Sequence, residues 1–199
     1  TDFALSFAAG DHAPVLPLWY GSVEWVRDLA RQMHGRGLVL MANCSWYMTP
    51  GWLTFVAPYL DVFGAEAPRF MDPEFIRAIA YRKSCTDLPY EPRPDWEVAR
   101  NQLWCIYPGH GNKVEVMART AQSFRDLAAA GWEPLTHVRV EPASVRVERY
   151  GHYLVLHNPA ETAVEATVTP DAQALGLREA RASFPVSLLA QGTVVVRLR

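Results

Sequence analysis

The sequence of 199 residues is 50% hydrophobic and 20% charged, with a formal net charge of -2. This balance is typical of a folded globular protein and excludes a disordered chain, a collagen and a coiled coil. It also excludes the concentrated basic surface that nucleic-acid binding needs, and the longest apolar run, Leu38 to Ala42, is too short to span a membrane.

Composition divides the chain into two regions. All seven tryptophans lie at or before Trp132, whereas residues 138–199 are rich in Val, Thr, Leu and Ala in short alternating runs. We therefore predict two domains, residues 1–135 and 136–199. No long linker separates them, so we expect them to pack together.

Two features bear on the origin of the chain. The sequence begins at Thr1, without a starting Met and without a signal segment, which predicts a processed product or an excised portion of a longer protein. The three cysteines, Cys44, Cys85 and Cys105, contain no CxxC pair and are predicted to be buried thiols rather than a disulfide framework.

The first region alternates helices with apolar strands. Ser22 is expected to cap a helix over residues 23–34, which Gly35 ends. The apolar run from Leu38 then predicts a buried parallel strand ending at Asn43. A short helix over 52–59 and a second buried strand over 60–65 follow, and Glu66 stands at the end of that strand.

The same pattern continues. Asp72 and Pro73 predict the start of a helix that runs to about residue 83, and a weak strand follows over 85–88. Asp95 is expected to cap a helix to about residue 102. A strand over 103–107, a loop over 108–112 and a helix over 113–130 complete the region.

Repeated strand–helix units predict an α/β fold with a parallel sheet. The four strands are too few for a complete (β/α)8 barrel, which takes about 250 residues. The first region is therefore either half a barrel or a small open sheet. In the second region, short strands separated by turn formers predict a small antiparallel β-sandwich, with strands over residues 138–140, 144–148, 153–157, 163–169 and 193–198.

Several segments together resemble bacterial glycoside-hydrolase-like (β/α)8 barrel proteins. The resemblance covers most of the chain, and its most specific part is the stretch from Gly131 to Arg139 with the strands that follow. The segments are Trp46, residues 56–66, the Asp72–Glu74 helix start, residues 81–83, residues 106–109, residues 130–139 and residues 145–151.

This resemblance implies the C-terminal half of a barrel followed by its β-sandwich. It also implies that four further strands precede Leu38, and that a catalytic nucleophile at the end of the fourth strand lies before Thr1. The chain by itself is then an incomplete glycoside hydrolase, and we expect it to be poorly active.

Glu66 is the candidate catalytic residue. It follows a buried strand and Gly64, at the edge of a parallel sheet where the active sites of such barrels form. A glycosidase needs two carboxylates, about 5 to 9.5 Å apart, and Glu66 can supply one of them as general acid or base. The alternative is that Glu66 caps the next helix or pairs with Arg69.

Other residues near strand ends are candidate substrate-binding groups. The Asn43 amide could bind a sugar hydroxyl, and Trp46 and Tyr47, in the loop after it, could stack on a pyranose ring. Asp87 and His110 lie near later strand ends. Each has a structural alternative, as a turn residue, a packed aromatic or a solvated loop group.

We expect no metal and no cofactor. The six histidines show no metal-ligand spacing such as HExxH, and the chain contains neither GxGxxG nor GxxxxGK[ST]. GxSxG is also missing, which disfavours a serine hydrolase. Asp61 begins a strand, so we expect it to make a structural hydrogen bond or salt bridge at the opposite edge of the sheet.

Two hypotheses of function follow. The first is a carbohydrate-active module that hydrolyses or binds glycosides through strand-end carboxylates. The second is a non-catalytic module in which the half-barrel associates with a complementary half-barrel or with itself, because an open sheet leaves unpaired edges. In either case Trp132, which follows Gly131, is expected to be largely buried between the two regions.

Overall fold

The computed structural model describes residues 6–7, 10–11, 13–15, 18–44, 50–66, 72–89, 91–109, 112–177 and 183–198. Its helices are α1 (Leu18–His34), α2 (Pro50–Val56), η1 (Ala57–Tyr59), α3 (Pro73–Ala80), α4 (Asp95–Arg100), η3 (Asn101–Trp104) and α5 (Val114–Ala130). Its strands are β1 (Ser6–Phe7), β2 (Pro14–Val15), β3 (Met41–Cys44), β4 (Val62–Glu66), β5 (Ser84–Leu88), β6 (Ile106–Pro108), β7 (Trp132–Glu133), β8 (Val138–Glu141), β9 (Arg146–Tyr150), β10 (Tyr153–His157), β11 (Val164–Pro170), β12 (Phe184–Leu188) and β13 (Thr193–Arg197).

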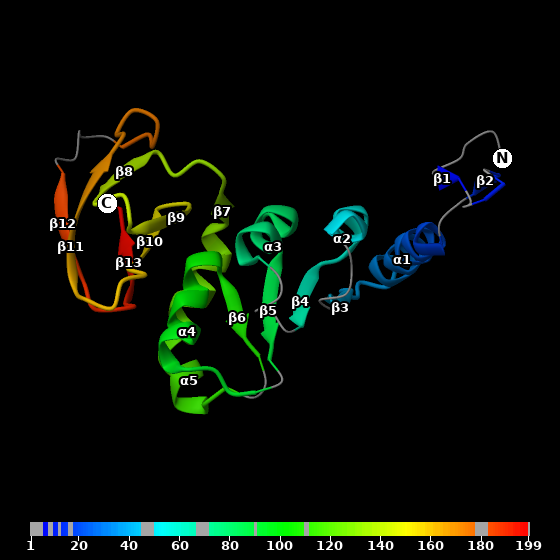
Figure 1. Cartoon of the computed structure of the whole chain (residues 1–199), viewed down its shortest axis with the longest axis horizontal. Helices are drawn as coiled ribbons and strands as arrows, with labels where there is room; N and C mark the ends of the chain where they lie inside the picture. The colour runs from blue at the N-terminus through cyan, green and yellow to red at the C-terminus, as the bar shows by residue number, and fades with distance from the viewer. Residues whose placement is uncertain are drawn as a thin grey trace.

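The fold is mixed α/β, with a parallel sheet followed along the chain by antiparallel sheets (Figure 1). The parallel sheet has the order β3-β4-β5-β6, so strands that are consecutive in the helix–strand repeat are also neighbours in space. β3 and β6 form its two ends, and the described strands do not close into a barrel. The predicted parallel sheet is thus confirmed.

Several helix boundaries follow the expected capping signals. Asp72 caps α3, because its side chain accepts a hydrogen bond from the Glu74 amide and Pro73 is the first helical residue. Gly131, with a φ of 79°, ends α5. Other predictions were wrong: α1 begins before Ser22, and Asp95 lies inside α4 without a side-chain cap.

The prediction of a buried strand from Leu38 to Ala42 is wrong in part. β3 begins only at Met41, and Leu38, Val39 and Met41 are 49%, 71% and 44% exposed. The physical reason is position, because β3 is the last strand of the sheet and has only β4 as a neighbour. β4, which is paired on both sides, keeps its apolar residues Phe63 and Ala65 buried.

Two antiparallel sheets form the C-terminal part of the chain. Their orders are β13-β10-β9-β7 and β12-β11-β8. Residues from both sheets meet in one core, which includes Leu154 and Leu156 of β10, Val168 of β11 and Leu188 of β12. The sequence did not predict β7 or β12, whereas β10 has the predicted bounds.

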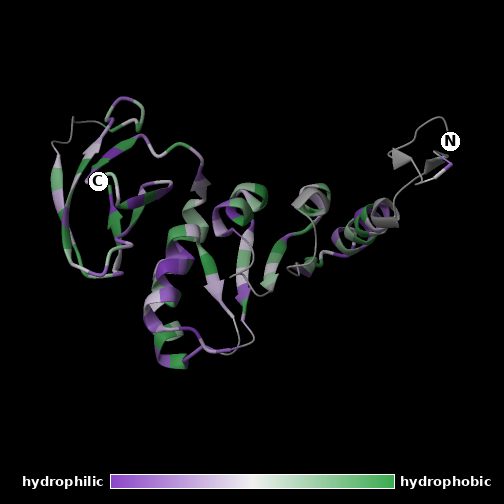
Figure 2. Ribbon diagram, in the orientation of Figure 1, coloured by the Kyte–Doolittle hydropathy of each residue, from purple (hydrophilic) through white to green (hydrophobic). Residues whose placement is uncertain are grey.

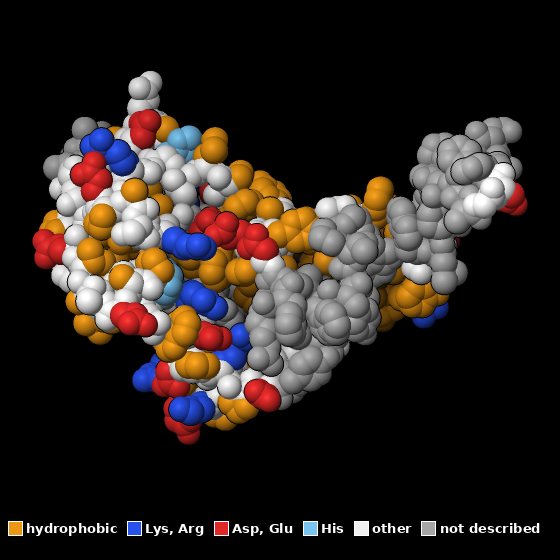
Figure 3. Space-filling view, viewed as in Figure 1, with side chains coloured by type: hydrophobic (Ala, Val, Ile, Leu, Met, Phe, Trp, Pro, Cys, Tyr) orange, Lys and Arg blue, Asp and Glu red, His pale blue; other side chains and the backbone are white. Residues whose placement is uncertain are grey.

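The main core joins the parallel sheet to the antiparallel strands. Tyr150 of β9 and Val155 of β10 pack in the same cluster as Phe63 and Phe124. Helices α4 and α5 carry hydrophilic outer faces (Figure 2), and charged side chains of both signs cover this part of the surface (Figure 3). Because residues of both parts belong to this one cluster, the two parts of the chain share a hydrophobic interior.

Trp132 lies at the junction and packs against the main core with only a minor part of its surface exposed, which agrees with the prediction that it is largely buried between the two regions. Its indole donates a hydrogen bond of 2.7 Å to Glu148 of β9, and its ring forms a T-shaped pair with the ring of Tyr81, with the centroids 6.2 Å apart. Trp132 thus contacts both parts of the molecule, as expected.

Two further expectations concern cysteines and membranes. Cys85 and Cys105 are free and buried, as predicted, whereas the side chain of Cys44 lies outside the described residues. Among the described helices, none is long and apolar enough to cross a bilayer.

Candidate functional site

The parallel sheet brings the predicted strand-end residues to a common edge. Asn43 of β3 is the register partner of Gly64 of β4, and Glu66 at the end of β4 is the partner of Leu88. Asp87 of β5 is in turn the partner of Pro108. Because all four strands run in the same direction, their carboxyl ends lie side by side.

Gly64 makes room for its neighbours on one face of this edge. A Cβ atom at Gly64 would lie 2.9 Å from Cδ1 of Leu88 and 3.0 Å from Oδ1 of Asn43. The side chains of Asn43 and Leu88 therefore approach each other over the glycine. Asn43 remains exposed, so its amide is available for hydrogen bonds to a ligand.

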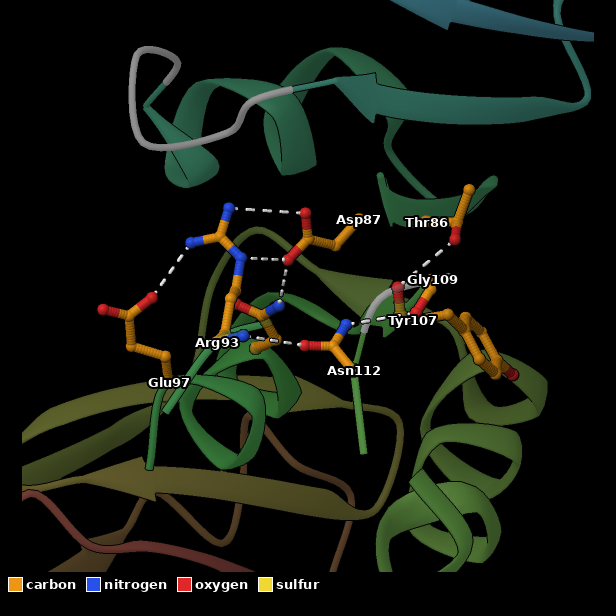
Figure 4. Close-up of polar contacts among 8 residues, drawn as sticks. Thr86, Asp87, Arg93, Glu97, Tyr107, Gly109 and Asn112 are labelled. Atoms are coloured by element: carbon orange, nitrogen blue, oxygen red, sulfur yellow. Dashed lines mark hydrogen bonds and ion pairs between the residues drawn. The ribbon is translucent and has the colours of Figure 1, made fainter. Parts of the chain in front are cut away.

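Asp87 lies on the other face, which packs against the helices. Within β5 the buried residues are Cys85 and Asp87, and the Asp87 side chain has no exposed surface. Its Oδ2 lies 2.7 Å from Nε of Arg93 and accepts a hydrogen bond of 3.1 Å from the Asn101 amide (Figure 4). Arg93, which precedes α4, also pairs with Glu97 in the first turn of that helix at 2.9 Å.

The electrostatics of this network come from burial. Loss of water raises the pKa of Asp87 above its usual range, and the positive charge of Arg93 opposes that rise. One guanidinium thus serves two carboxylates, those of Asp87 and Glu97. The Asp87 side chain therefore supports the site from the face of the sheet that packs against the helices, and it does not face solvent.

The same network ties together the loops after β5 and β6. The backbone N–H of Arg93 donates to Oδ1 of Asn112 at 3.4 Å. The side-chain amide of Asn112 in turn donates to the Gly109 carbonyl at 3.1 Å. The backbone of Gly109 lies directly against β5, as shown by the position of a Cβ atom built there, which would overlap the Asp87 carbonyl oxygen. These contacts fix the backbone of two strand-end loops at the candidate site (Figure 4).

Several predicted site residues lie outside the described part of the chain. These are Trp46, Tyr47 and His110. The backbone of Glu66 ends β4 as expected, but its side chain is not described. The structure therefore brings together the backbones of Asn43, Glu66 and Asp87 at one edge. The buried side chain of Asp87 contacts Arg93 and Asn101 instead of facing a ligand, whereas the binding roles of Asn43 and Glu66 stay predictions.

Asp61 makes the structural contacts that the sequence predicted. Its Oδ2 accepts a hydrogen bond of 2.7 Å from the Leu40 amide and lies 2.8 Å from Nε2 of His34. The Leu40 amide, followed by His34, holds the pKa of Asp61 below its usual range. This pairing lies at the amino edge of the sheet.

Sequence reasoning missed the groups that surround Asp87. The i,i+4 spacing of Arg93 and Glu97 indicates an ion pair, but nothing in the sequence shows that Arg93 also reaches Asp87. The contacts of Asn101 with Asp87 and of Asn112 with Arg93 give no local signal either, because these partners are 14 and 19 residues away in the sequence. Among the described residues, no group of three or more His, Cys, Asp or Glu side chains could hold a metal ion.

Comparison with family models, with curated proteins and with solved structures found no match for this chain.

Proposed function

We propose that this protein is a carbohydrate-active module, with the second half of a glycoside-hydrolase-type (β/α)8 barrel followed by its β-sandwich. It binds or hydrolyses glycosides at the carboxyl edge of the parallel sheet. Glu66 acts there as general acid or base, and Asn43 holds a sugar hydroxyl. Trp46, Tyr47 and His110 complete the binding surface.

The observation that carries this proposal is the strand order of the parallel sheet. The order β3-β4-β5-β6, with a helical connection after each strand, is the arrangement of consecutive units in a (β/α)8 barrel. A doubly wound sheet instead reverses its strand order, and its ligand binds at that reversal. In barrel enzymes the carboxyl edge carries the active site, and here that edge carries Asn43 and Glu66.

A binding and hydrolysis experiment tests the proposal. Methyl glycosides of several sugars are titrated and followed by NMR, and the corresponding 4-nitrophenyl glycosides are assayed for hydrolysis. We expect at least one sugar to bind, and Glu66→Gln or Asn43→Ala to weaken binding by about tenfold, as the loss of a polar ligand contact does. Hydrolysis should stay near background, because the proposed partner carboxylate is not part of this chain.

The matched control is Glu115→Gln, which removes an exposed carboxylate from the first turn of α5. It should leave sugar binding unchanged. If no glycoside binds at millimolar concentration, or if binding is the same in Glu66→Gln and Asn43→Ala as in the unaltered protein, the proposal is wrong.

The second candidate function is assembly through the open edge of β3. That strand has no outer neighbour among the described residues, and Leu38, Val39 and Met41 beside it are exposed. Trp25 of α1 and Phe55 of α2 are also more than half exposed. A strand at the end of a sheet with exposed apolar side chains favours association, here with a complementary half-barrel or a second copy.

Light scattering after size-exclusion chromatography tests this second function. We expect oligomers that become monomers when Val39→Lys and Met41→Lys place charges beside β3. Leu189→Lys, which alters an exposed residue after β12, should leave the oligomers intact. A monomer at every concentration would remove self-assembly from consideration.

A further inference from the structure

A groove lies between the end of α2 with η1 and the end of α3. Its volume is about 570 Å³, which is within the size range of small-molecule sites. Ala57, Pro58, Ile79 and Ala80 give it mainly apolar walls, and Thr54, Tyr81, Arg82 and Lys83 complete its lining. The groove lies near the starts of β4 and β5, at the opposite edge of the sheet from Asn43 and Glu66.

Tyr81 presents an aromatic ring to this groove. The residue is 47% exposed, although it is large and hydrophobic. Its backbone has a φ of 53°, in the left-handed region that residues other than glycine seldom adopt. Trp132 forms a T-shaped pair with the ring, and the Arg82 guanidinium lies 5.3 Å from the centroid of the Tyr81 ring. The ring is therefore held in place by neighbours while much of it remains open.

Lys83 brings a positive charge to the same groove. Its Nζ donates to the carbonyl oxygens of Ala57 and Pro58 at 2.7 and 2.9 Å, so two of its three N–H groups are used. No carboxylate of a described residue forms an ion pair with it. Arg82, by contrast, pairs with Glu133. The carboxylate of Asp61 makes its hydrogen bonds to His34 and Leu40 instead of to Lys83.

The surroundings of Lys83 favour a negatively charged ligand. Burial lowers the pKa of Lys83, and the charge of Asp61 only partly opposes this. An acid group near Nζ would offset the cost of the half-buried charge and would take the remaining N–H group. Among the described residues that line the groove, none has an acidic side chain.

We infer that this groove binds a small organic anion with a flat apolar body, its ring packed on Tyr81 and the apolar walls and its acid group on Nζ of Lys83. This site does not depend on the proposed glycoside site. The two lie at opposite edges of the sheet and share no residues.

Three probes separate the parts of this ligand. Benzoate has both the flat ring and the acid, benzyl alcohol has the ring without the charge, and acetate has the charge without the ring. Binding is followed by NMR at the Tyr81 ring and the Trp132 indole. We expect benzoate to bind with a dissociation constant on the order of millimolar, and each other probe at least about tenfold more weakly.

The chain offers a matched pair of variants, because Lys83 and Lys113 are its two lysines. Lys83→Met should weaken benzoate binding by at least about tenfold, since it removes the charge but keeps an apolar side chain of similar length. Lys113→Met, which removes a 63% exposed lysine paired with Asp95, should leave binding unchanged.

A measurement on the unaltered protein covers the case in which Lys83→Met does not fold. Acylation of the two lysines by an N-hydroxysuccinimide ester is followed by mass spectrometry, with and without benzoate. Benzoate should slow modification of Lys83 at least about threefold, as a charge-assisted contact to the amine requires, and should not affect Lys113.

The inference is overturned if benzoate causes no saturable change, or if benzyl alcohol or acetate binds as tightly as benzoate. It is also overturned if benzoate leaves the acylation of Lys83 unprotected. None of these outcomes bears on the binding of glycosides at Glu66, which is tested with different ligands and different variants.

Discussion

At the scale of single residues, Asp87 and Arg93 are the most tightly constrained charges at the candidate site. Asp87 is fully buried and Arg93 is only 13% exposed at the side chain. A buried ion pair of this kind adds little net stability, but removing one partner leaves the other charge uncompensated. The pair therefore matters most as a fixed support for the loops after β5 and β6.

We predict that Arg93→Met lowers the free energy of unfolding by about 3 to 5 kcal/mol at neutral pH, because it leaves a buried carboxylate. The loss should depend on pH. Burial already raises the pKa of Asp87, and removal of Arg93 raises it further. A carboxyl whose pKa is raised by folding favours the folded state below the ordinary aspartate pKa of about 4, and this contribution is lost as pH rises through the raised value.

Denaturant unfolding of the variant and the unaltered protein between about pH 3 and pH 7 checks this prediction. The difference between them should be small at the acidic end and grow as pH rises. Adding Asp87→Asn to Arg93→Met should abolish that growth, because the titrating group is gone. A difference that is constant across the range would contradict the assignment of Asp87 as the titrating group.

At the scale of elements, the contact of β5 with β6 depends on a glycine. Gly109 comes so close to the Asp87 carbonyl that a Cβ would overlap its oxygen, and the obstacle is backbone rather than a flexible side chain. We predict that Gly109→Ala costs about 3 kcal/mol or more, because β6 must move away from β5. Denaturant unfolding measures the loss.

Gly21→Ala provides the control for this element. Gly21 lies in α1, and no atom of the described residues, apart from its chain neighbours and its own helix backbone, lies within 4 Å of the place that an alanine Cβ would take, so alanine should stabilise the helix by about 0.5 to 1 kcal/mol. If both substitutions were tolerated equally, the close approach of β6 to β5 described above would be incorrect.

At the scale of the whole molecule, one core connects the parallel sheet with the antiparallel strands. Tyr150 of β9 is fully buried, and its hydroxyl donates to the Leu103 carbonyl of η3 at 3.0 Å. Burial raises the pKa of Tyr150 well above its usual range, so the hydroxyl stays protonated as a donor. This contact joins segments that are 47 residues apart.

We predict that Tyr150→Phe lowers the free energy of unfolding by about 1 to 3 kcal/mol, because it leaves a buried carbonyl without this donor. Unfolding should remain a single transition, with tryptophan fluorescence and far-UV circular dichroism giving the same midpoint. The tryptophans lie in the first part of the chain, so fluorescence reports on it, whereas circular dichroism reports on both parts.

Tyr153→Phe is the matched control, because the Tyr153 hydroxyl makes no hydrogen bond to a described residue and its loss should change stability by less than about 0.5 kcal/mol. Two separate transitions would show that the parts of the molecule fold independently, and equal effects of the two substitutions would show that the Tyr150 hydrogen bond does not stabilise the junction.

Local signals in the sequence determined much of the element order. The alternation of helices with apolar runs predicted the four parallel strands, and local capping chemistry predicted the start of α3 at Asp72 and the end of α5 at Gly131. These features were predictable because they depend on residues close together in the chain. The placement of Glu66 and Asp87 at strand ends followed from the same patterns.

Only the tertiary structure decided which of these residues are buried and what they contact. The apolar run at Leu38 could not show that β3 is the end of the sheet, because exposure depends on neighbours far away in sequence. The pairing of Asp87 with Arg93, and the groove at Lys83, likewise arise from segments that meet only after folding. Sequence periodicity fixes which face a side chain occupies, whereas packing between elements decides whether that face meets solvent, a helix or a charge.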